Sequence, residues 1–115
     1  MTRRVRVVIC GFGKVGRNFA RLLDTKRQIA SERHGIEIEL AGVGELKGSV
    51  LSDGGIPPSA LAEYFETHGN LGNYPETGKP EWEGADIVRE AARTNVLVET
   101  TPTDIKTGEP ALTHI

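Results

Sequence analysis

The sequence contains one cysteine, and aromatic residues make up only 5% of its 115 positions. Cys10 cannot form an internal disulfide, which excludes the small disulfide-stabilised secreted proteins, so we expect a cytoplasmic location. No apolar run approaches the roughly 20 residues that a bilayer-crossing helix needs, and no secretory signal pattern follows Met1. We therefore expect no contact with a membrane.

An excess of charge of either sign is also absent. Charged residues make up 26% of the sequence and the formal net charge is −2. A nucleic-acid-binding domain is usually strongly basic, so we expect no nucleic-acid partner. Arg3, Arg4 and Arg6 form a short basic segment that we expect to be solvated. The length fits a single domain.

Glycine, by contrast, is abundant, and three glycines stand at informative positions. Residues 5–9 are mostly Val and Ile, which is typical of a strand buried on both faces of a parallel sheet, and Gly11, Gly13 and Gly16 follow. Gly11 would permit a tight turn, Gly13 the close approach of a pyrophosphate, and Gly16 close packing of the next helix. The N-terminus of that helix would face the phosphates. The pattern predicts a bound dinucleotide, and the alternative is a glycine-rich turn without a ligand.

Helical periodicity follows the glycines. The apolar stripe consists of Val15, Phe19, Leu22 and Leu23. This pattern predicts a helix that ends at Gly35. Residues 36–43 alternate and then become apolar, which predicts a second strand. Strand, helix and strand together form a right-handed βαβ unit.

The second half of the chain is less regular. We expect a turn at residues 52–55, a helix from Pro57-Pro58 to Gly69, and a long loop at residues 70–80 with Trp82 as a packing anchor. A helix at residues 84–93 and a third strand at residues 95–99 follow, and a last helix begins at Pro110. About three parallel strands with flanking helices indicate an α/β, Rossmann-like fold that is incomplete. We expect residues 1–115 to be the dinucleotide-binding portion of a longer protein; a naturally short protein is the alternative.

Glu45 and Lys47 follow the second strand, where a dinucleotide fold binds the adenine ribose. A carboxylate accepts hydrogen bonds from the ribose hydroxyls and favours NAD, whereas a cation favours the 2′-phosphate of NADP. The sequence offers both residues, so the cofactor is either NAD or NADP. Their distance from the glycines exceeds the usual ~20 residues because the first helix is long.

Thr100, Thr101 and Pro102 follow the third strand at the same edge of the sheet. Ligands of open α/β sheets bind along this edge. A threonine hydroxyl or a backbone amide there would contact the nicotinamide ribose or the pyrophosphate. A turn with capping threonines is the alternative, and both interpretations are compatible. Glu99 would orient the loop by accepting hydrogen bonds from backbone N–H groups.

No catalytic set is recognisable. His34, His68 and His114 are scattered, and we expect each to lie at the surface. No cysteine or carboxylate pair has the spacing of metal ligands. Cys10 ends the first strand, where we expect a buried thiol. The sequence therefore predicts neither a catalytic residue nor a metal site.

Three segments resemble the amino-terminal part of homoserine dehydrogenases. They are residues 8–17, residues 42–49, and residues 97–103 with the Thr-Gly-Glu-Pro-Ala run at residues 107–111. The resemblance implies an oxidoreductase that interconverts L-homoserine and L-aspartate 4-semialdehyde with NAD or NADP, in threonine and methionine biosynthesis. It places Phe12, Gly13, Lys14 and Val15 along the diphosphate, Glu45 and Lys47 near the adenosine ribose, and Thr100, Thr101 and Pro102 near the nicotinamide.

Two departures from the family limit what the resemblance implies. Glu45 stands where the family often has aspartate, which lengthens its reach. The family's Asn-Lys-Gly segment and its substrate and dimerisation domain are not in this sequence, so its catalytic lysine, acidic substrate ligands and metal site would lie outside it. We expect this chain to bind the cofactor without turnover and to form a homo-oligomer, a dimer, through an open sheet edge. A stand-alone dinucleotide-sensing module is the alternative.

Overall fold

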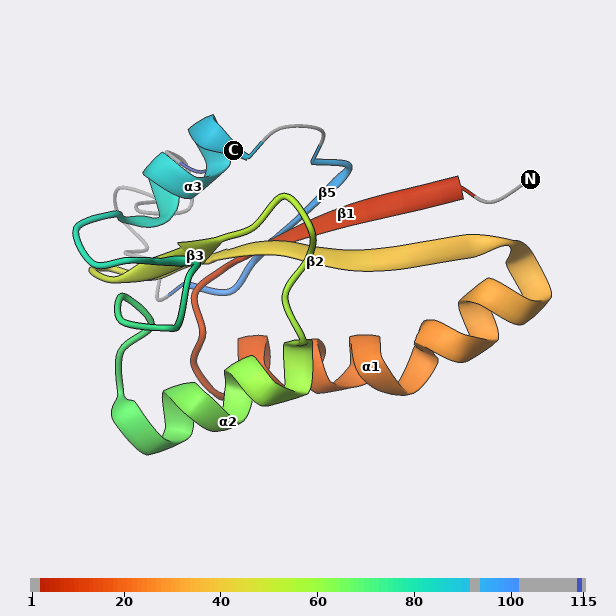
Figure 1. Cartoon of the computed structure of the whole chain (residues 1–115), viewed down its shortest axis with the longest axis horizontal. Helices are drawn as coiled ribbons and strands as arrows, with labels where there is room; N and C mark the ends of the chain where they lie inside the picture. Colours follow the sequence, from red (N-terminus) through yellow and green to blue (C-terminus); the bar gives the residue numbers. More distant parts are fainter. Residues whose placement is uncertain (1–2, 92–93, 102–113, 115) are drawn as a thin grey trace, which may run out of the picture.

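Five strands form one mixed sheet with helices on both faces (Figure 1). The structure is a computed structural model, and it describes residues 3–91, 94–101 and 114. The strand order is β4-β3-β2-β1-β5. Strand β1 (Arg3–Cys10) pairs in parallel with both β2 (Ile36–Gly44) and β5 (Val96–Glu99). This arrangement confirms the Rossmann-like fold and its three predicted parallel strands.

The main core lies between the sheet and two helices. Helices α1 (Lys14–His34) and α2 (Pro58–His68) cover one face, and α3 (Gly84–Glu90) covers part of the other (Figure 1). The larger apolar cluster lies on the α1–α2 side, and a smaller one, which Trp82 joins as predicted, lies under α3. Each fully buried Leu, Ile or Phe side chain contributes about 1.5–3 kcal/mol. None of the helices in the described part of the chain is long and apolar enough to cross a bilayer.

The predicted C-terminal ends of α1 and α2 are confirmed, but part of the apolar stripe predicted for α1 is wrong. Gly35 and Gly69 end α1 and α2 with φ of 62° and 72°, a left-handed conformation that suits glycine. In α1, Val15 is 68% exposed and Leu22 is 49% exposed. Leu23 is buried and Phe19 packs against the core, as predicted, and Gly16 and Ala20 complete the buried face of the helix. Gly16 lies there because a Cβ at this position would come within 2.3 Å of the Gly11 carbonyl oxygen, in the loop that follows β1.

Two short strands were not predicted. Strand β3 (Ser49–Leu51) pairs antiparallel with β2, and β4 (Gly78–Lys79) pairs antiparallel with β3. Strands of three and two residues are too short to produce a periodic pattern. Helix α3 ends at Glu90 rather than at the predicted residue 93, and Ala91 is already extended. The helix predicted from Pro110 lies outside the described residues, except for the helical His114.

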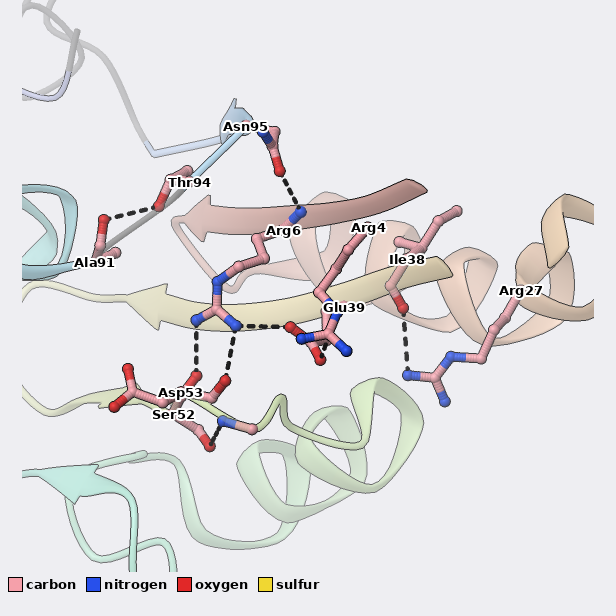
Figure 2. Close-up of polar contacts among 11 residues, drawn as sticks. Arg4, Arg6, Arg27, Ile38, Glu39, Ser52, Asp53, Ala91, Thr94 and Asn95 are labelled. Atoms are coloured by element: carbon pink, nitrogen blue, oxygen red, sulfur yellow. Dashed lines mark hydrogen bonds and ion pairs between the residues drawn. The ribbon is translucent and has the colours of Figure 1, made fainter. Parts of the chain in front are cut away.

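The prediction that Arg6 is solvated is wrong. Arg6 is 6% exposed, and its guanidinium Nη1 donates to Glu39 Oε2 at 2.6 Å (Figure 2). The same guanidinium donates to the backbone carbonyls of Asp53 (2.8 Å) and Ser52 (3.1 Å). Arg6 is the register partner of Glu39, and the turn at residues 52–53 brings its carbonyls to the same place. Arg6 therefore links β1, β2 and this turn.

Candidate functional site

The glycine loop between β1 and α1 is shaped by close backbone contacts. Gly11 has a φ of +92°, and a Cβ there would lie 2.6 Å from the backbone nitrogen of Thr101. A Cβ on Gly16 would lie 2.3 Å from the carbonyl oxygen of Gly11. Both positions therefore require glycine, one for the turn and one for helix packing, as the sequence predicted. Apart from Gly13 and its chain neighbours, no atom of the described residues lies within 4 Å of the place that a Gly13 Cβ would take, so the described part of the loop is open at Gly13.

The N-terminus of α1 is also open. Gly13 is the N-cap residue, without a side-chain capping bond, and the first turn contains no acidic residue. Lys14 and Val15 are exposed beside it. The first N–H groups of the helix and its positive dipole end are therefore available to an anion.

Phe12 offers only its backbone to this edge of the sheet. Its side chain is fully buried and packs edge-on against Phe65, with ring centroids 5.6 Å apart. Its N–H donates to Glu45 Oε1 at 2.5 Å, and its carbonyl accepts a bond from Arg17 Nη1 at 2.9 Å. The Phe12 side chain is thus part of the core, and any ligand contact of this residue is through the main chain.

Glu45 connects the end of β2 to the glycine loop. Besides the Phe12 N–H, its carboxylate accepts the N–H of Leu46 at 3.3 Å, and its own N–H donates to the Ser49 hydroxyl at 3.1 Å. Lys47 points into solvent, with its Nζ 3.8 Å from Glu81 Oε2. The two residues predicted to lie near the ribose therefore differ: Glu45 is held against the loop and Lys47 is exposed.

Thr100 holds the end of β5 against the same loop, and Thr101 bonds back to Glu99 at the end of β5. The Thr100 N–H donates to the Cys10 carbonyl at 2.8 Å, and its hydroxyl donates to the Gly11 carbonyl at 2.7 Å. The Thr101 N–H donates to Glu99 Oε1 at 2.9 Å, and the Thr101 hydroxyl contacts the same oxygen. These bonds confirm that Glu99 orients the loop. Pro102 lies outside the described residues.

A buried cluster beneath this loop was not predicted. His114 is 5% exposed, so the prediction of a surface residue is wrong, and its Nδ1 lies 2.6 Å from Glu99 Oε2. Burial raises the pKa of Glu99, but hydrogen bonds from Thr101 and His114 outweigh burial and hold that pKa below its usual range. Burial, and then the charges of Glu99 and Glu45, raise the pKa of the Cys10 thiol to about 12. No sequence signal connects positions 10, 99 and 114; strand pairing and packing bring them together.

Two surface hollows lie away from the glycine loop. One, of about 600 Å³, lies between α2 and the segment before β4, and Tyr64 and Tyr74 line it. The other, of about 440 Å³, lies beside the first half of β2. Neither includes a residue of the glycine loop.

Comparison with known proteins points to dehydrogenases. No family model matches the sequence. The chain is 31% identical over 109 residues to the homoserine dehydrogenase of Methanocaldococcus jannaschii, a match that covers 95% of this chain and 32% of that protein. It is 33% identical over 97 residues to the NADP-specific glutamate dehydrogenase of Saccharolobus shibatae, covering 80% of this chain and 21% of that protein.

A solved structure gives the same result. A hyperthermophilic archaeal homoserine dehydrogenase in complex with NADPH superimposes with a TM-score of 0.69 and 26% identity, covering 85% of this chain and 28% of that one. The chain thus spans about a third or less of the length of the relatives it matches. The resemblance that the sequence motifs predicted is confirmed: neighbours in both sequence and structure are homoserine dehydrogenases.

Proposed function

We propose that this chain is the NAD(P)-binding portion of a homoserine dehydrogenase, which interconverts L-homoserine and L-aspartate 4-semialdehyde. The observation that carries the proposal is the open N-terminus of α1 at Gly13, in a chain whose fold matches an NADPH-bound enzyme of this name. The complete protein would act in the cytoplasm as a dimer, in threonine and methionine biosynthesis. The chain alone would bind the cofactor without turnover.

The main chain of the glycine loop would hold the pyrophosphate. Gly13 offers no side chain, and the first N–H groups of α1, at Lys14 and Val15, follow it directly. Glu99, Thr100 and Thr101 fix the neighbouring loop, on the nicotinamide side of the site. The bound cofactor would carry out the hydride transfer, and these residues would orient the cofactor in the site.

We propose NADP(H) as the preferred cofactor. Two of the similar proteins are described with NADPH or as NADP-specific. Lys47 is exposed, and its ion-pair partner within the described part of the chain is the similarly exposed Glu81, at a long 3.8 Å. Because such surface pairs contribute little, the ammonium group can reorient toward a 2′-phosphate. Glu45 is held by the Phe12 N–H, so its carboxylate is directed to the loop.

Titration of the purified chain with NADPH and NADH, followed by calorimetry or by nucleotide fluorescence, tests both proposals. Gly13→Ala puts a methyl group where the pyrophosphate would lie, and we expect it to weaken NADPH binding at least about tenfold, or about 1.4 kcal/mol. Gly54→Ala is the matched control, because no atom lies within 4 Å of its Cβ either and it is remote from the loop.

Four results would contradict the proposals. If neither dinucleotide binds, the proposed binding function of this chain is wrong. If Gly13→Ala and Gly54→Ala bind NADPH with equal affinity, the ligand does not lie at Gly13. Tighter binding of NADH than of NADPH would reverse the cofactor preference. Reduction of aspartate 4-semialdehyde by the isolated chain, measured as NADPH consumption, would show that the expectation of binding without turnover is wrong.

A further inference from the structure

Three different metal-binding side chains meet below the glycine loop. Cys10 and Glu99 are register partners on the neighbouring parallel strands β1 and β5, so their side chains lie on the same face of the sheet. His114 reaches this place from a distant part of the sequence. The Cys10 sulfur, a Glu99 carboxylate oxygen and a His114 ring nitrogen all lie within 4.8 Å of one another.

The cluster is buried, and as a metal site it would contain two negatively charged ligands. Cys10 is fully buried, His114 is nearly so, and the Glu99 side chain is 19% exposed. Within the described residues, Glu99 forms no ion pair with a lysine or arginine, and His114 is its ion-pair partner. A thiolate and a carboxylate together would carry two negative charges. Buried charges are costly unless they are paired or coordinate a metal, and a divalent cation would neutralise both.

We propose that Cys10, Glu99 and His114 bind a zinc ion. Thiolate, imidazole and carboxylate are the ligands that Zn²⁺ uses in proteins, whereas Mg²⁺ and Ca²⁺ prefer oxygen alone. Binding displaces the thiol proton, which passes to solvent, and His114 would coordinate through Nδ1 as a neutral imidazole with its ring proton on Nε2. Three protein ligands leave the fourth tetrahedral position to a water molecule.

Small movements are enough to form the site. With bonds of about 2.0–2.3 Å, the ligand atoms of a tetrahedral zinc ion lie roughly 3.3–3.7 Å apart. The 2.6 Å contact between His114 Nδ1 and Glu99 Oε2 would have to widen by about 0.7 Å. The Cys10 sulfur, within 4.8 Å of both atoms, would have to move by at most about 1.5 Å. Rotation about the side-chain bonds supplies movements of this size.

Neighbouring groups already orient two of the ligands. The Thr101 N–H and hydroxyl hold Glu99 Oε1, which leaves Oε2 for the ion. The His114 ring packs against Gly84, where a Cβ would come within 2.5 Å of its Nε2, so Nδ1 faces Glu99. Such outer contacts typically fix the ring and carboxylate of metal ligands. The ion would tie β1 and β5 together directly below the Gly11 turn.

The test uses the chain without an affinity tag, stripped of metal by a chelator and titrated with Co²⁺, a spectroscopic substitute for Zn²⁺. We expect one Co²⁺ per chain, a thiolate-to-cobalt charge-transfer band, and its loss when Zn²⁺ displaces the cobalt. Cys10→Ala should abolish the band. Loss of a residue that only hydrogen-bonds to a metal ligand typically weakens metal binding roughly 10- to 100-fold. Cys10→Ala and His114→Gln remove ligands themselves, so each should weaken Zn²⁺ binding by more than this. His68→Gln, which alters an exposed histidine, is the control.

A folded wild-type chain that takes up Co²⁺ without a charge-transfer band, or takes up none, would overturn the proposal without any variant. Wild-type Zn²⁺ affinity in either ligand variant, or equal weakening by His68→Gln, would also overturn it. Circular dichroism shows whether each variant is folded. Dinucleotide binding is measured separately, so failure of the zinc proposal would not contradict the proposed dinucleotide-binding function.

Discussion

Arg6 shows at the scale of one residue how much a buried cation contributes. Its guanidinium contacts the Glu39 carboxylate and two backbone carbonyls. Arg6→Ala leaves that carboxylate and those carbonyls without their donor. Since breaking a buried pair typically costs 3–5 kcal/mol and this site is only partly buried, we expect a loss of about 2–4 kcal/mol in the free energy of unfolding, measured by urea denaturation.

Arg4→Ala is the matched control for Arg6. The Arg4 side chain is 61% exposed and its Nε lies 3.9 Å from the same Glu39 carboxylate. Exposed pairs of this kind contribute about 0–1 kcal/mol, so Arg4→Ala should leave stability nearly unchanged. A similar loss in both variants would mean that the cost arises from general charge effects and not from the buried contacts.

At the scale of elements, one carboxylate joins the two helices on the same face of the sheet. Glu66 of α2 accepts bonds from Arg21 (2.6 and 2.9 Å) and Arg17 (3.1 Å) of α1. The Arg21 hydrogen bond is the largest cause that lowers the pKa of Glu66 to about 2, and Arg17 adds to it. The contact therefore links α1 to α2 near the N-terminus of α1.

This lowered pKa predicts a pH dependence of stability. Because the folded-state pKa lies below the unfolded value of about 4.3, the ionised Glu66 stabilises the fold above that pH. The contribution is lost as the pH falls from about 4.3 toward 2. We expect Glu66→Gln to flatten the decline in unfolding free energy over this range, measured by denaturation at several pH values. Glu63→Gln, on the same helix, should retain the wild-type decline, and an unchanged decline in Glu66→Gln would contradict the prediction.

The parallel strands and long helices were predictable because each is long enough to show its own period. The limits of α1 and α2 followed from Gly35, Pro58 and Gly69, whose backbone preferences are local. Strands β3 and β4 were missed because they are too short for a pattern. The antiparallel pairing of β3 with β2 also depends on a chain reversal that includes Gly48, where φ is +90°. Local backbone preference therefore predicts which helices and strands form, whereas the pairing of the strands depends on the rest of the fold.

At the scale of the whole molecule, β5 is an edge strand of the described sheet. It pairs only with β1, and its first residue, Val96, is 41% exposed. Unpaired strand edges promote association of chains. We expect the isolated chain to self-associate at high concentration, and Val96→Lys to reduce this, as measured by sedimentation velocity over a concentration series.

Leu46→Lys is the control for the edge. Leu46 is 73% exposed but lies outside the strands, so this variant removes apolar surface without changing the edge. Equal reductions by both variants would point to general hydrophobic association. A wild-type chain that stays monomeric at every concentration would contradict the expected dimer for this chain.

The sequence by itself determined the parts that depend on neighbours along the chain. These are the β1–α1–β2 unit, the glycine turn at Gly11, and the resemblance to homoserine dehydrogenases, because spacing and backbone preference are local properties. Only the tertiary structure decided the burial of Arg6, the contact of Glu45 with the glycine loop, and the meeting of Cys10, Glu99 and His114. These depend on which strands pair and which turns pack together, and residues 10, 99 and 114 have no relation in sequence until β1 lies beside β5.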